Sequence, residues 1–459
     1  MSRNFLDIDV SFALKKGNPA GRGLSDSELR KSLGKIKKGM EKLTRLVDDG
    51  EVGFTSLPYY ENELKKVTRI ASSLRRRYRR LVVLGIGGSA LGTKAVIEGL
   101  RGVRKMEEVT VFDNVDPEEF VPALEEFPPG ETLFTVISKS GGTAETLAQY
   151  FLVLDLLKRR FKEGWKERVV VITDPKKGFL REVAEKEGLL SFSVPPSVGG
   201  RFSVFTPVGL FPLSFAGVRV RKLLEGARVV DGAFRTLPPE DNPVLLLAAV
   251  YRHFFSEAAK NAFVFFIYSS FLKRVGEWFC QLWGESLGKR DGSGRPVGQI
   301  PVVVTGVTDQ HSQLQLYADG PDDKIYTFLR VVDRKRDRVI RGAGSDGRTS
   351  FLEGKRLGEL FDSEFDATRY SLAGRGRPVV TITGGRRDED FIGGLLYLMQ
   401  CVTAIVGLSC DLNPFDQPGV EEGKILTKAM LGDASHSSRM KDLEKFRKGE
   451  GRKKVRLEL

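Results

Sequence analysis

Short apolar runs alternate with longer amphipathic segments along most of this sequence, and this alternation is its strongest constraint on the fold. In the first half, the runs are "LVVLGIG", "EVTVFDN", "TLFTVIS" and "RVVVITD". Runs of this length, rich in β-branched residues, are typical of strands buried on both faces of a parallel sheet. The segments between them, such as 143–161, have the length of helices. Strands that alternate with helices predict an α/β fold.

A second alternation of the same kind follows in the other half of the chain. Its predicted strands lie at 262–270, 299–307, 324–332 and 377–384, and its predicted helices near 271–288, 310–318, 355–370 and 388–408. We interpret the basic, proline-containing stretch 217–243 as the join between two units. The prediction is a helical N-terminal extension, two doubly wound parallel-sheet domains in tandem, and a basic C-terminal tail, at 1–70, 71–225, 226–435 and 436–459. Ser25 and Glu28 form a capping-box pattern at the start of a helix in the extension.

Composition and charge exclude several classes of protein. The chain has 459 residues, 41% hydrophobic and 29% charged, as in globular proteins. Its net charge of +13 would suit nucleic acid or small anionic substrates. Part of the charge lies in the tail, where 438–459 holds nine Lys or Arg against four Asp or Glu. Charge runs alone are unspecific, so we interpret this one as a solvated tail and expect no nucleic-acid partner.

The sequence indicates no membrane segment and no metal centre. We find neither a run of about 18 apolar residues nor a signal segment at the start, so we expect a cytoplasmic protein without membrane contact. The cysteines are too few and too scattered for a disulfide framework or a zinc site: Cys280, Cys401 and Cys410. The histidines are likewise too scattered for a local metal cluster: His253, His311 and His436.

Two glycine-rich loops follow predicted strands, "LGIGGSALGTK" at 84–94 and "KSGGTAET" at 139–146. Ligands of parallel sheets bind beyond the carboxyl ends of the strands, where helix N-termini present free N–H groups. In the second loop, hydroxyl groups come from Ser138, Ser140 and Thr143, and the glycines let the backbone approach a ligand closely. This donor set predicts a site for a compact phosphomonoester.

The first loop also satisfies a dinucleotide-binding fingerprint. Gly85, Gly87 and Ala90 have the GxGxxG/A spacing, and Asp113 stands at the end of the next predicted strand. Against this interpretation, a dinucleotide site would leave the second, hydroxyl-rich loop without a function. A phosphate-binding P-loop is excluded because Thr93 stands where that motif requires lysine. Either loop alone could be a plain strand-to-helix turn, but together they indicate a sugar phosphate.

Four further residues could take part in chemistry. Glu285 falls seven residues after Trp278 on a predicted helix, so its carboxylate shares an apolar face and suits a general base, unless it only ends the helix near Lys289. Arg201 follows two glycines and could stabilise an oxyanion. His311 follows a strand, close to Asp309 in the sequence. Lys424, with Gln417 before it, starts a last helix, where it could equally be a surface lysine.

Six motifs in order resemble the glucose-6-phosphate isomerase family: "GIGGSALG", "SKSGGTAET", "GGRFSVFTPVG", "GEWFCQLWGES", "DQHSQLQ" and "FDQPGVEEGK". The resemblance implies two sugar-isomerase-type (SIS) domains and cofactor-free interconversion of glucose 6-phosphate and fructose 6-phosphate. It implies Glu285 as the base, Arg201 as the group that stabilises the cis-enediolate, and His311 and Lys424 in ring opening. The positions it implies for the phosphate and the rest of the site are Gly88, Ser89, Ser138, Lys139, Ser140, Thr143 and Gln417. Family members are dimers, so we expect a homodimer with His311 donated across the interface.

One position departs from the family pattern, and two other functions remain open. Members commonly carry threonine where this chain has Gly142, which removes one hydroxyl and puts phosphate affinity in doubt. No residue decides whether mannose 6-phosphate is also a substrate. The other functions are an NAD-linked dehydrogenase and a sugar-phosphate sensor without catalysis. Turnover of fructose 6-phosphate without nucleotide distinguishes all three.

Overall fold

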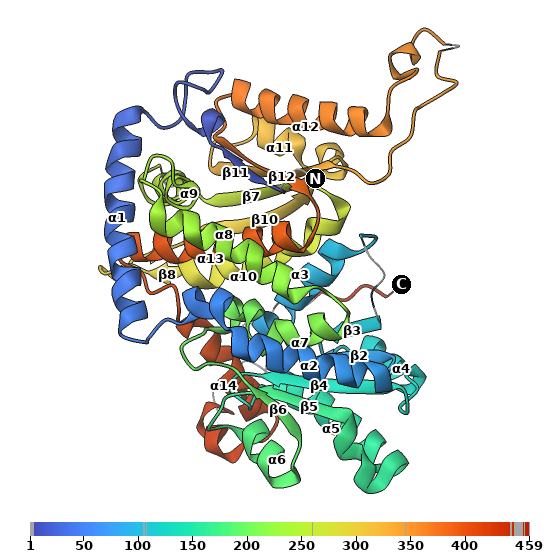
Figure 1. The fold of residues 1–459 in the computed structure, drawn as a ribbon. Coiled ribbons are helices and arrows are strands. Elements are labelled where there is room, and N and C mark those ends of the chain that lie inside the picture. Colours follow the sequence, from blue (N-terminus) through green and yellow to red (C-terminus); the bar gives the residue numbers. More distant parts are fainter. Residues whose placement is uncertain are drawn as a thin grey trace. The chain divides into compact units, whose positions relative to one another are not determined.

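The computed structural model describes residues 4–103, 106, 108–258, 260–344, 346–440, 443–444, 453 and 455–458. The chain divides into two compact units, Met1–Pro414 and Phe415–Leu459. The first unit contains two five-stranded sheets and their helices (Figure 1). The expected α/β architecture is therefore confirmed.

The first sheet has the strand order β3-β2-β4-β5-β6, and all its neighbouring strands are parallel. Its strands are β2 (Arg80–Leu84), β3 (Glu108–Phe112), β4 (Thr132–Ser138), β5 (Val169–Thr173) and β6 (Leu190–Ser193). Every residue of β4 and β5 is buried, as continuous apolar strands require. Because the chain crosses from β3 over β2 to β4, the order reverses between β2 and β4. Such a reversal is where open α/β sheets bind ligands.

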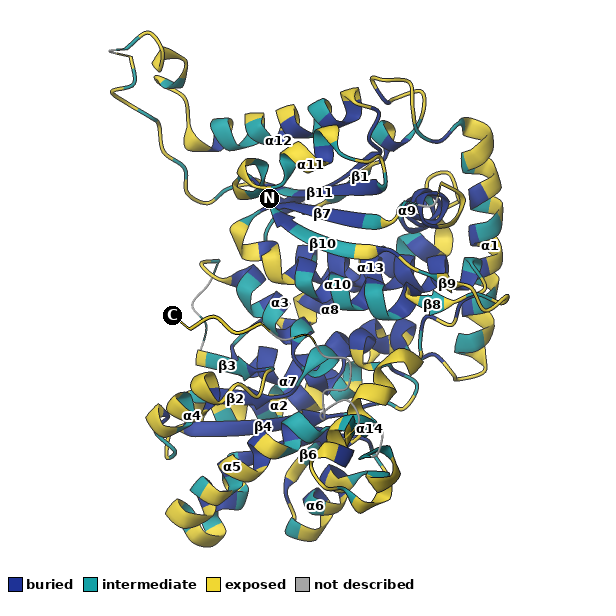
Figure 2. Cartoon of the chain, turned by 180° about the vertical axis from the view of Figure 1, so that it is seen from behind, coloured by how far each residue is buried: buried dark blue, intermediate teal, exposed yellow. Residues whose placement is uncertain are grey.

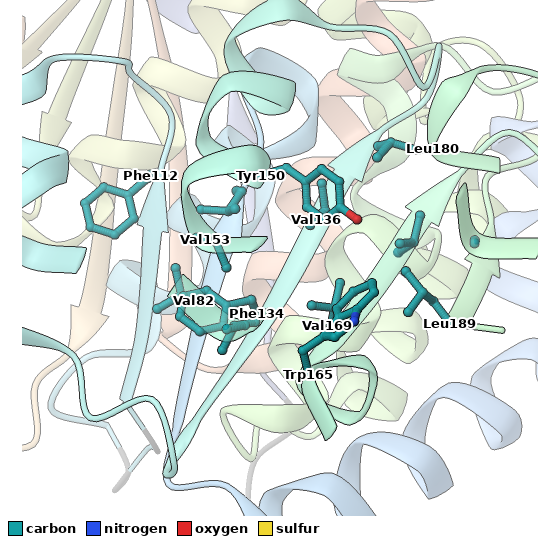
Figure 3. Close-up of a cluster of buried hydrophobic side chains, with 14 of the residues drawn as sticks. Val82, Phe112, Phe134, Val136, Tyr150, Val153, Trp165, Val169, Leu180 and Leu189 are labelled. Atoms are coloured by element: carbon teal, nitrogen blue, oxygen red, sulfur yellow. The ribbon is translucent and has the colours of Figure 1, made fainter. Parts of the chain in front are cut away.

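Helices cover the first sheet on both faces, as strand-to-strand crossovers require. They are α2 (Glu61–Arg77), α3 (Leu91–Leu100), α4 (Pro117–Glu126), α5 (Ala144–Phe161), α6 (Phe179–Glu187) and α7 (Pro207–Phe215). On one face, aromatic side chains fill the space between sheet and helices, among them Phe112, Phe134, Tyr150 and Trp165 (Figure 3). Sequence analysis missed α4, whose start is marked by Asp116, which accepts a hydrogen bond from the Glu118 N–H.

The second sheet has the order β1-β12-β11-β7-β10. Its strands are β1 (Leu6–Asp9), β7 (Ala262–Tyr268), β10 (Ile300–Thr305), β11 (Lys324–Asp333) and β12 (Val379–Arg386). The four later strands are parallel, whereas β1 pairs with β12 antiparallel. The residues 1–70 are thus not only helical, because β1 belongs to this sheet. β10 is an edge strand.

The remaining helices and the small hairpin of the first unit lie around the second sheet. The helices are α1 (Asp26–Asp48), α8 (Val220–Thr236), α9 (Pro243–Arg252), α10 (Lys273–Leu287), α11 (Leu314–Asp319), α12 (Leu357–Gly374) and α13 (Glu389–Ser409), and the hairpin is formed by β8 (Lys289–Arg290) and β9 (Pro296–Val297). The predicted capping box of α1 is confirmed, because the Ser25 side chain and the Glu28 side chain each accept the other residue's backbone N–H.

The stretch predicted to join the two domains is mostly the helix α8, which packs closely against α13. A Cβ atom added at Gly226 would lie 1.9 Å from the Asp390 carbonyl oxygen, and one at Gly393 would lie 1.9 Å from that of Leu223. The two backbones therefore touch, and only glycine fits at the crossing. The predicted boundary between residues 225 and 226 falls inside this helix.

The helix α13 corrects the expectation that the chain has no apolar run long enough to cross a bilayer. Its 21 residues reach a mean hydropathy of 1.9 in the most apolar window, and all of that window is buried inside the protein. Figure 2 shows α13 in the colour of buried residues. A helix with protein on all sides needs no polar face, so it resembles a membrane span in composition alone.

The second unit contains the helix α14 (Glu421–Met430) between the short turns Pro418–Val420 and Ala434–Arg439. Half of the basic tail predicted at 436–459 lies outside the described residues.

Candidate active site

The hydroxyl groups of the second glycine-rich loop converge at the start of α5. The Ser138 and Thr143 oxygens are 2.8 Å apart, and Ser140 Oγ lies 3.4 Å from each of them. Thr143 is the N-cap residue of α5, yet its side chain makes no capping hydrogen bond to that helix. Its hydroxyl is instead turned toward the two serines, so three donors gather at a helix N-terminus, where the dipole favours an anion.

The glycines of this loop differ in what they permit. Gly141 has a φ of +69°, and a Cβ there would lie 3.1 Å from the Gly178 backbone, so the turn requires glycine. A Cβ at Gly142 would meet nothing within 4 Å. Close packing therefore does not require glycine at position 142, where the chain departs from the family pattern.

The first glycine-rich loop lies beside the second, because β2 and β4 are neighbouring strands. Its residues Gly87–Ser89 form a short turn that packs on the backbone ahead of Arg201. A Cβ at Gly88 would lie 2.2 Å from the Gly200 carbonyl carbon, and the Ser203 hydroxyl donates to the Gly88 carbonyl over 3.3 Å. The close approach explains why position 88 is glycine.

Asp113, the acidic residue of the possible dinucleotide fingerprint, has a partner within the chain. Its carboxylate forms an ion pair with the Lys94 ammonium at 2.8 Å. In a dinucleotide site this carboxylate would have to accept hydrogen bonds from a ribose. The observed ion pair weakens the dehydrogenase hypothesis.

Lys139 points to a neighbouring loop of the protein. Its ammonium donates hydrogen bonds to the Pro196 carbonyl oxygen at 2.8 Å and to the Val198 carbonyl oxygen at 2.9 Å. Burial lowers the pKa of this lysine below its usual range, against a smaller opposing effect of the nearby Asp174 carboxylate.

Arg201 is held in the interior by residues far away in the sequence, with only 1% of its side chain exposed. Its Nε–H donates to Ser286 Oγ at 2.7 Å, and Nη1 lies 3.3 Å from Glu285 Oε2. Nη2 donates to the Pro414 carbonyl oxygen. These contacts fix the plane of the guanidinium, which cannot lose its charge. A preorganised positive charge of this kind can stabilise a developing oxyanion.

Glu285 stands in the last turn of α10, and 32% of its side chain is exposed. Trp278, earlier on the same helix, is buried as the helical spacing predicted. The two carboxylate oxygens have different partners, since Oε2 faces Arg201 and Oε1 accepts a hydrogen bond from the Gln281 amide at 3.1 Å. The structure thus brings Glu285 and Arg201 together, with an open side from which a substrate can approach the carboxylate.

Sequence analysis missed Gln281 and Ser286, which hold this pair. Gln281 lies one turn before Glu285, and its amide nitrogen would be 2.9 Å from a Cβ at Gly87. It therefore lies between the first glycine-rich loop and the carboxylate. The spacing of four residues on a helix was a usable signal for Gln281, whereas nothing local in the sequence connects Ser286 with Arg201.

His311 ends the short turn Thr308–His311 after β10, and it is exposed. Asp309, its neighbour in the sequence, accepts hydrogen bonds from the Thr305 N–H at 2.7 Å and the Ser312 hydroxyl at 2.8 Å. Gln310 anchors the turn by donating to Thr368 Oγ1 at 2.6 Å. Within the described residues, His311 and Glu285 make no hydrogen bond to each other.

Gln417 and Lys424 belong to the second unit, so they are described only within it. Gln417 directly precedes the turn Pro418–Val420. Lys424 forms an ion pair with Glu421 at 2.8 Å, and more than half of each side chain is exposed. In the part of the chain that the structure describes, no group of three or more His, Cys, Asp or Glu could hold a metal ion.

Comparisons with known proteins show which family the chain is similar to. The family model described as phosphoglucose isomerase matches residues 44–344. The chain is 40% identical to a glucose-6-phosphate isomerase from Carboxydothermus hydrogenoformans, over 90% of this chain and 92% of that protein. It is 37% identical to the one from Rubrobacter xylanophilus, over 92% of this chain and 98% of that protein.

Two solved structures are similar along most of the chain. The crystal structure of a hypothetical protein from Thermus thermophilus has a TM-score of 0.85 at 35% identity, covering 93% of this chain and 100% of that one. A glucose-6-phosphate isomerase from Chlamydia trachomatis has the same fold, with a TM-score of 0.77 at 23% identity, covering 86% of this chain and 81% of that one. The family model matches more than half of the chain, and the curated relatives match nearly all of it. The chain therefore belongs to the phosphoglucose isomerase family.

Proposed function

We propose that this protein interconverts glucose 6-phosphate and fructose 6-phosphate, a step of glycolysis and gluconeogenesis, without a cofactor. The observation that carries the proposal is the contact between the buried Arg201 guanidinium and the partly exposed Glu285 carboxylate. Moving a proton between two neighbouring carbons requires a base and a stabiliser for the oxyanion that forms between the two steps. These two side chains supply both.

The proton transfer follows from the chemistry of the open-chain sugar. Glu285 removes the proton from C2 of the aldose, and the electrons of that bond form the cis-enediolate, whose negative oxygen Arg201 stabilises. The hydroxyl proton then passes from O2 to O1, and the same carboxyl group returns the carbon-bound proton to C1 while the carbonyl forms at C2, which gives the ketose. His311 and Lys424 act before this step by moving protons during ring opening, because the closed ring has no carbonyl to acidify the C–H bond.

The phosphate group binds at the N-terminus of α5 in this proposal. Ser138, Ser140 and Thr143 would donate hydroxyl hydrogen bonds to its oxygens, and their mutual distances of 2.8 to 3.4 Å suit one compact anion. The remaining family positions, Gly88, Ser89, Lys139 and Gln417, would line the rest of the site.

We further propose a homodimer in which His311 completes the partner's site. His311 is exposed, and it follows β10, an edge strand of its sheet. Large apolar side chains of the neighbouring elements are exposed too, since Ile300 of β10 is 69% exposed and Leu316 of α11 is 52% exposed. Exposed apolar groups near a sheet edge are typical of a surface that another chain covers. A cytoplasmic location stays a prediction.

Turnover of fructose 6-phosphate tests the activity. The protein is incubated with this sugar and a chelator, without nucleotide, and glucose 6-phosphate is measured. We expect rapid formation of product. Turnover that requires a nicotinamide nucleotide would support a dehydrogenase, and binding of the sugar phosphate without turnover would support a sensor. Either result would contradict the proposal.

Subunit mixing tests the origin of His311. Glu285→Gln and His311→Ala, each inactive alone, are dissociated together and allowed to reassociate. If His311 acts across the interface, a mixed dimer has one site with both lesions and one site with neither. Random mixing makes about half of the dimers mixed, so the recovered rate should approach about a quarter of that of wild type. No recovery despite demonstrated subunit exchange would place His311 in the same chain's site or outside it.

A further inference from the structure

The ammonium of Lys139 is engaged by the protein itself at the edge of the candidate phosphate site. It donates to the carbonyl oxygens of Pro196 and Val198, at 2.8 and 2.9 Å. An ammonium has three N–H donors, so these bonds occupy two of them. The contacts join the end of β4 to a loop some 57 residues later in the chain. The side chain therefore points at backbone rather than standing free above the three hydroxyls.

The loop that Lys139 holds leads directly into Arg201. Val198 is buried, and the Gly53 N–H donates to the Ser197 carbonyl oxygen at 3.0 Å on the loop's other side. Three residues after Val198 the chain reaches Arg201, whose guanidinium must meet Ser286 and Glu285. A shift of this loop would move the Arg201 backbone and with it the guanidinium.

The loop that contains Pro196 and Val198 is closely packed, so such a shift would also disturb its neighbours. Gly88 and Gly200 are in backbone contact, so the first glycine-rich loop lies directly against the segment that Lys139 steadies. A hydrogen bond from a charged donor to a carbonyl oxygen is stronger than one from a neutral donor. Burial lowers the pKa of the lysine, as expected for an ammonium that has exchanged water for these carbonyls.

We propose that Lys139 is a positioning residue, which sets the place of Arg201 by binding the Pro196 and Val198 carbonyls, and is not the main ligand of the substrate phosphate. The inference rests on the proposed function of Arg201 and Glu285. The family resemblance implies that Lys139 binds the phosphate. In the role proposed here, the charge of Lys139 acts on the Pro196 and Val198 carbonyls and not on the anion. Phosphate then depends on the hydroxyls of Ser138, Ser140 and Thr143.

Lys139→Met tests the proposal because it keeps an unbranched side chain, one atom shorter than that of lysine, and removes its donors. We expect kcat to fall by about tenfold or more, since two charge-assisted hydrogen bonds that position Arg201 are lost. The inhibition constant of inorganic phosphate should stay within about twofold, because the hydroxyl groups remain. A direct phosphate contact predicts the reverse, a weaker inhibition by phosphate with little change in kcat. That reverse result would overturn the proposal.

Two further variants separate positioning from general loss of structure. Lys139→Arg should restore a large part of kcat, because a guanidinium can also donate to two carbonyl oxygens. Lys186→Met, a matched change of an exposed lysine in the same domain, should leave both constants unchanged. If Lys139→Met does not fold, Lys139→Gln, which keeps an amide donor, replaces it with the same expected split between kcat and phosphate inhibition.

Amide hydrogen exchange gives a readout that does not need turnover. In Lys139→Met, the peptide covering 196–203 should exchange faster than in wild type, while a peptide from α13 should be unchanged. Unchanged exchange in 196–203 would contradict the proposal even if the protein proves not to be an isomerase. Conversely, inactive wild-type protein with faster exchange in the variant would reject the proposed function and retain the link between Lys139 and the loop.

Discussion

The hydroxyl loop at 138–143 and the Arg201–Glu285 pair are built in opposite ways. The loop gathers its donors from neighbouring positions, so a single strand-to-helix turn makes the cluster. The pair joins two residues that are separated by 84 positions, Arg201 from beside the first sheet and Glu285 from beside the second. The loop is also partly solvated, whereas the Arg201 side chain is 1% exposed. Anion binding can be local in the chain, but a stabilised oxyanion needs a charge that the whole fold holds in place.

This difference predicts different kinds of damage from substitution. Changes in the loop should weaken binding, because its hydroxyls meet a group that does not react. Changes in the pair should slow turnover, because its charges meet the atoms whose bonds change. Substitutions in each region therefore distinguish a loss of binding from a loss of turnover.

Glu285→Gln should have the largest effect. The amide keeps the shape of the side chain but cannot accept the proton, so kcat should fall by ~100-fold to 10,000-fold while substrate binding changes only a few-fold. Steady-state kinetics with fructose 6-phosphate gives kcat, and equilibrium binding gives the affinity. Glu277→Gln, on the same helix, where Glu277 pairs with Arg274, is the matched control and should retain activity. More than a tenth of wild-type turnover in Glu285→Gln would remove this residue from the proposed role.

Arg201→Lys should have the second-largest effect on turnover. An ammonium keeps the charge but not the planar fork that meets Ser286, Glu285 and the Pro414 carbonyl together. We expect kcat to fall by about 100-fold to 1,000-fold, the usual loss when one oxyanion donor is removed. A thermal melt should accompany the kinetics, so that lost structure is not mistaken for lost chemistry. Full activity in a folded variant would exclude Arg201 from the mechanism.

The double variant Ser140→Ala and Thr143→Ala changes the hydroxyl loop and should therefore weaken binding. Losing hydrogen bonds to a charged ligand should raise the Michaelis constant by about tenfold or more, with a much smaller change in kcat. Inhibition by inorganic phosphate should weaken in parallel. Ser72→Ala with Ser73→Ala, exposed serines on α2, serves as the control. Unchanged inhibition by phosphate would mean that the loop does not hold the anion.

Ser286→Ala should give the smallest effect and the finest test of how Arg201 is held. It removes the acceptor of the Nε–H of Arg201, 2.7 Å away, and a donor left without a partner in the interior costs about 1 to 3 kcal/mol of stability. We expect a fall in kcat of a few-fold. Combined with Arg201→Lys, the two losses should be less than additive if Ser286 acts only through the arginine. Additive losses would indicate an independent role.

Much of this architecture could be predicted because it depends on local patterns. The strands of both sheets other than β1 and β6, and the helices α1, α2, α5, α10, α12 and α13, follow from periodicity and from caps such as Ser25. For the two glycine-rich loops, the sequence indicated the kind of site that they form but not which strands bring them side by side. That β2 and β4 are neighbours, at the point where strand order reverses, is decided by pairing that no single segment encodes.

Two further stretches show the same division between local pattern and distant contacts. The stretch 217–243 carries charge and proline, which suggested a join, and the structure shows that most of it is the helix α8, whose Gly226 lies against the α13 backbone. The helix α13 passes for a membrane span because sequence records its apolar composition but not the protein that surrounds it.

The sequence by itself determined the alternation of strands and helices, the glycine-rich turns with their hydroxyls, and the residue types available for proton transfer. These depend on interactions within a few positions, where dihedral preferences and hydrogen-bond reach decide the outcome. Only the tertiary structure decided that Ser286 and Gln281 hold Arg201 and Glu285, that Asp113 pairs with Lys94, and that Lys139 turns to the Pro196–Val198 loop. Such contacts join distant segments, and their geometry arises from packing that close-range sequence patterns do not contain.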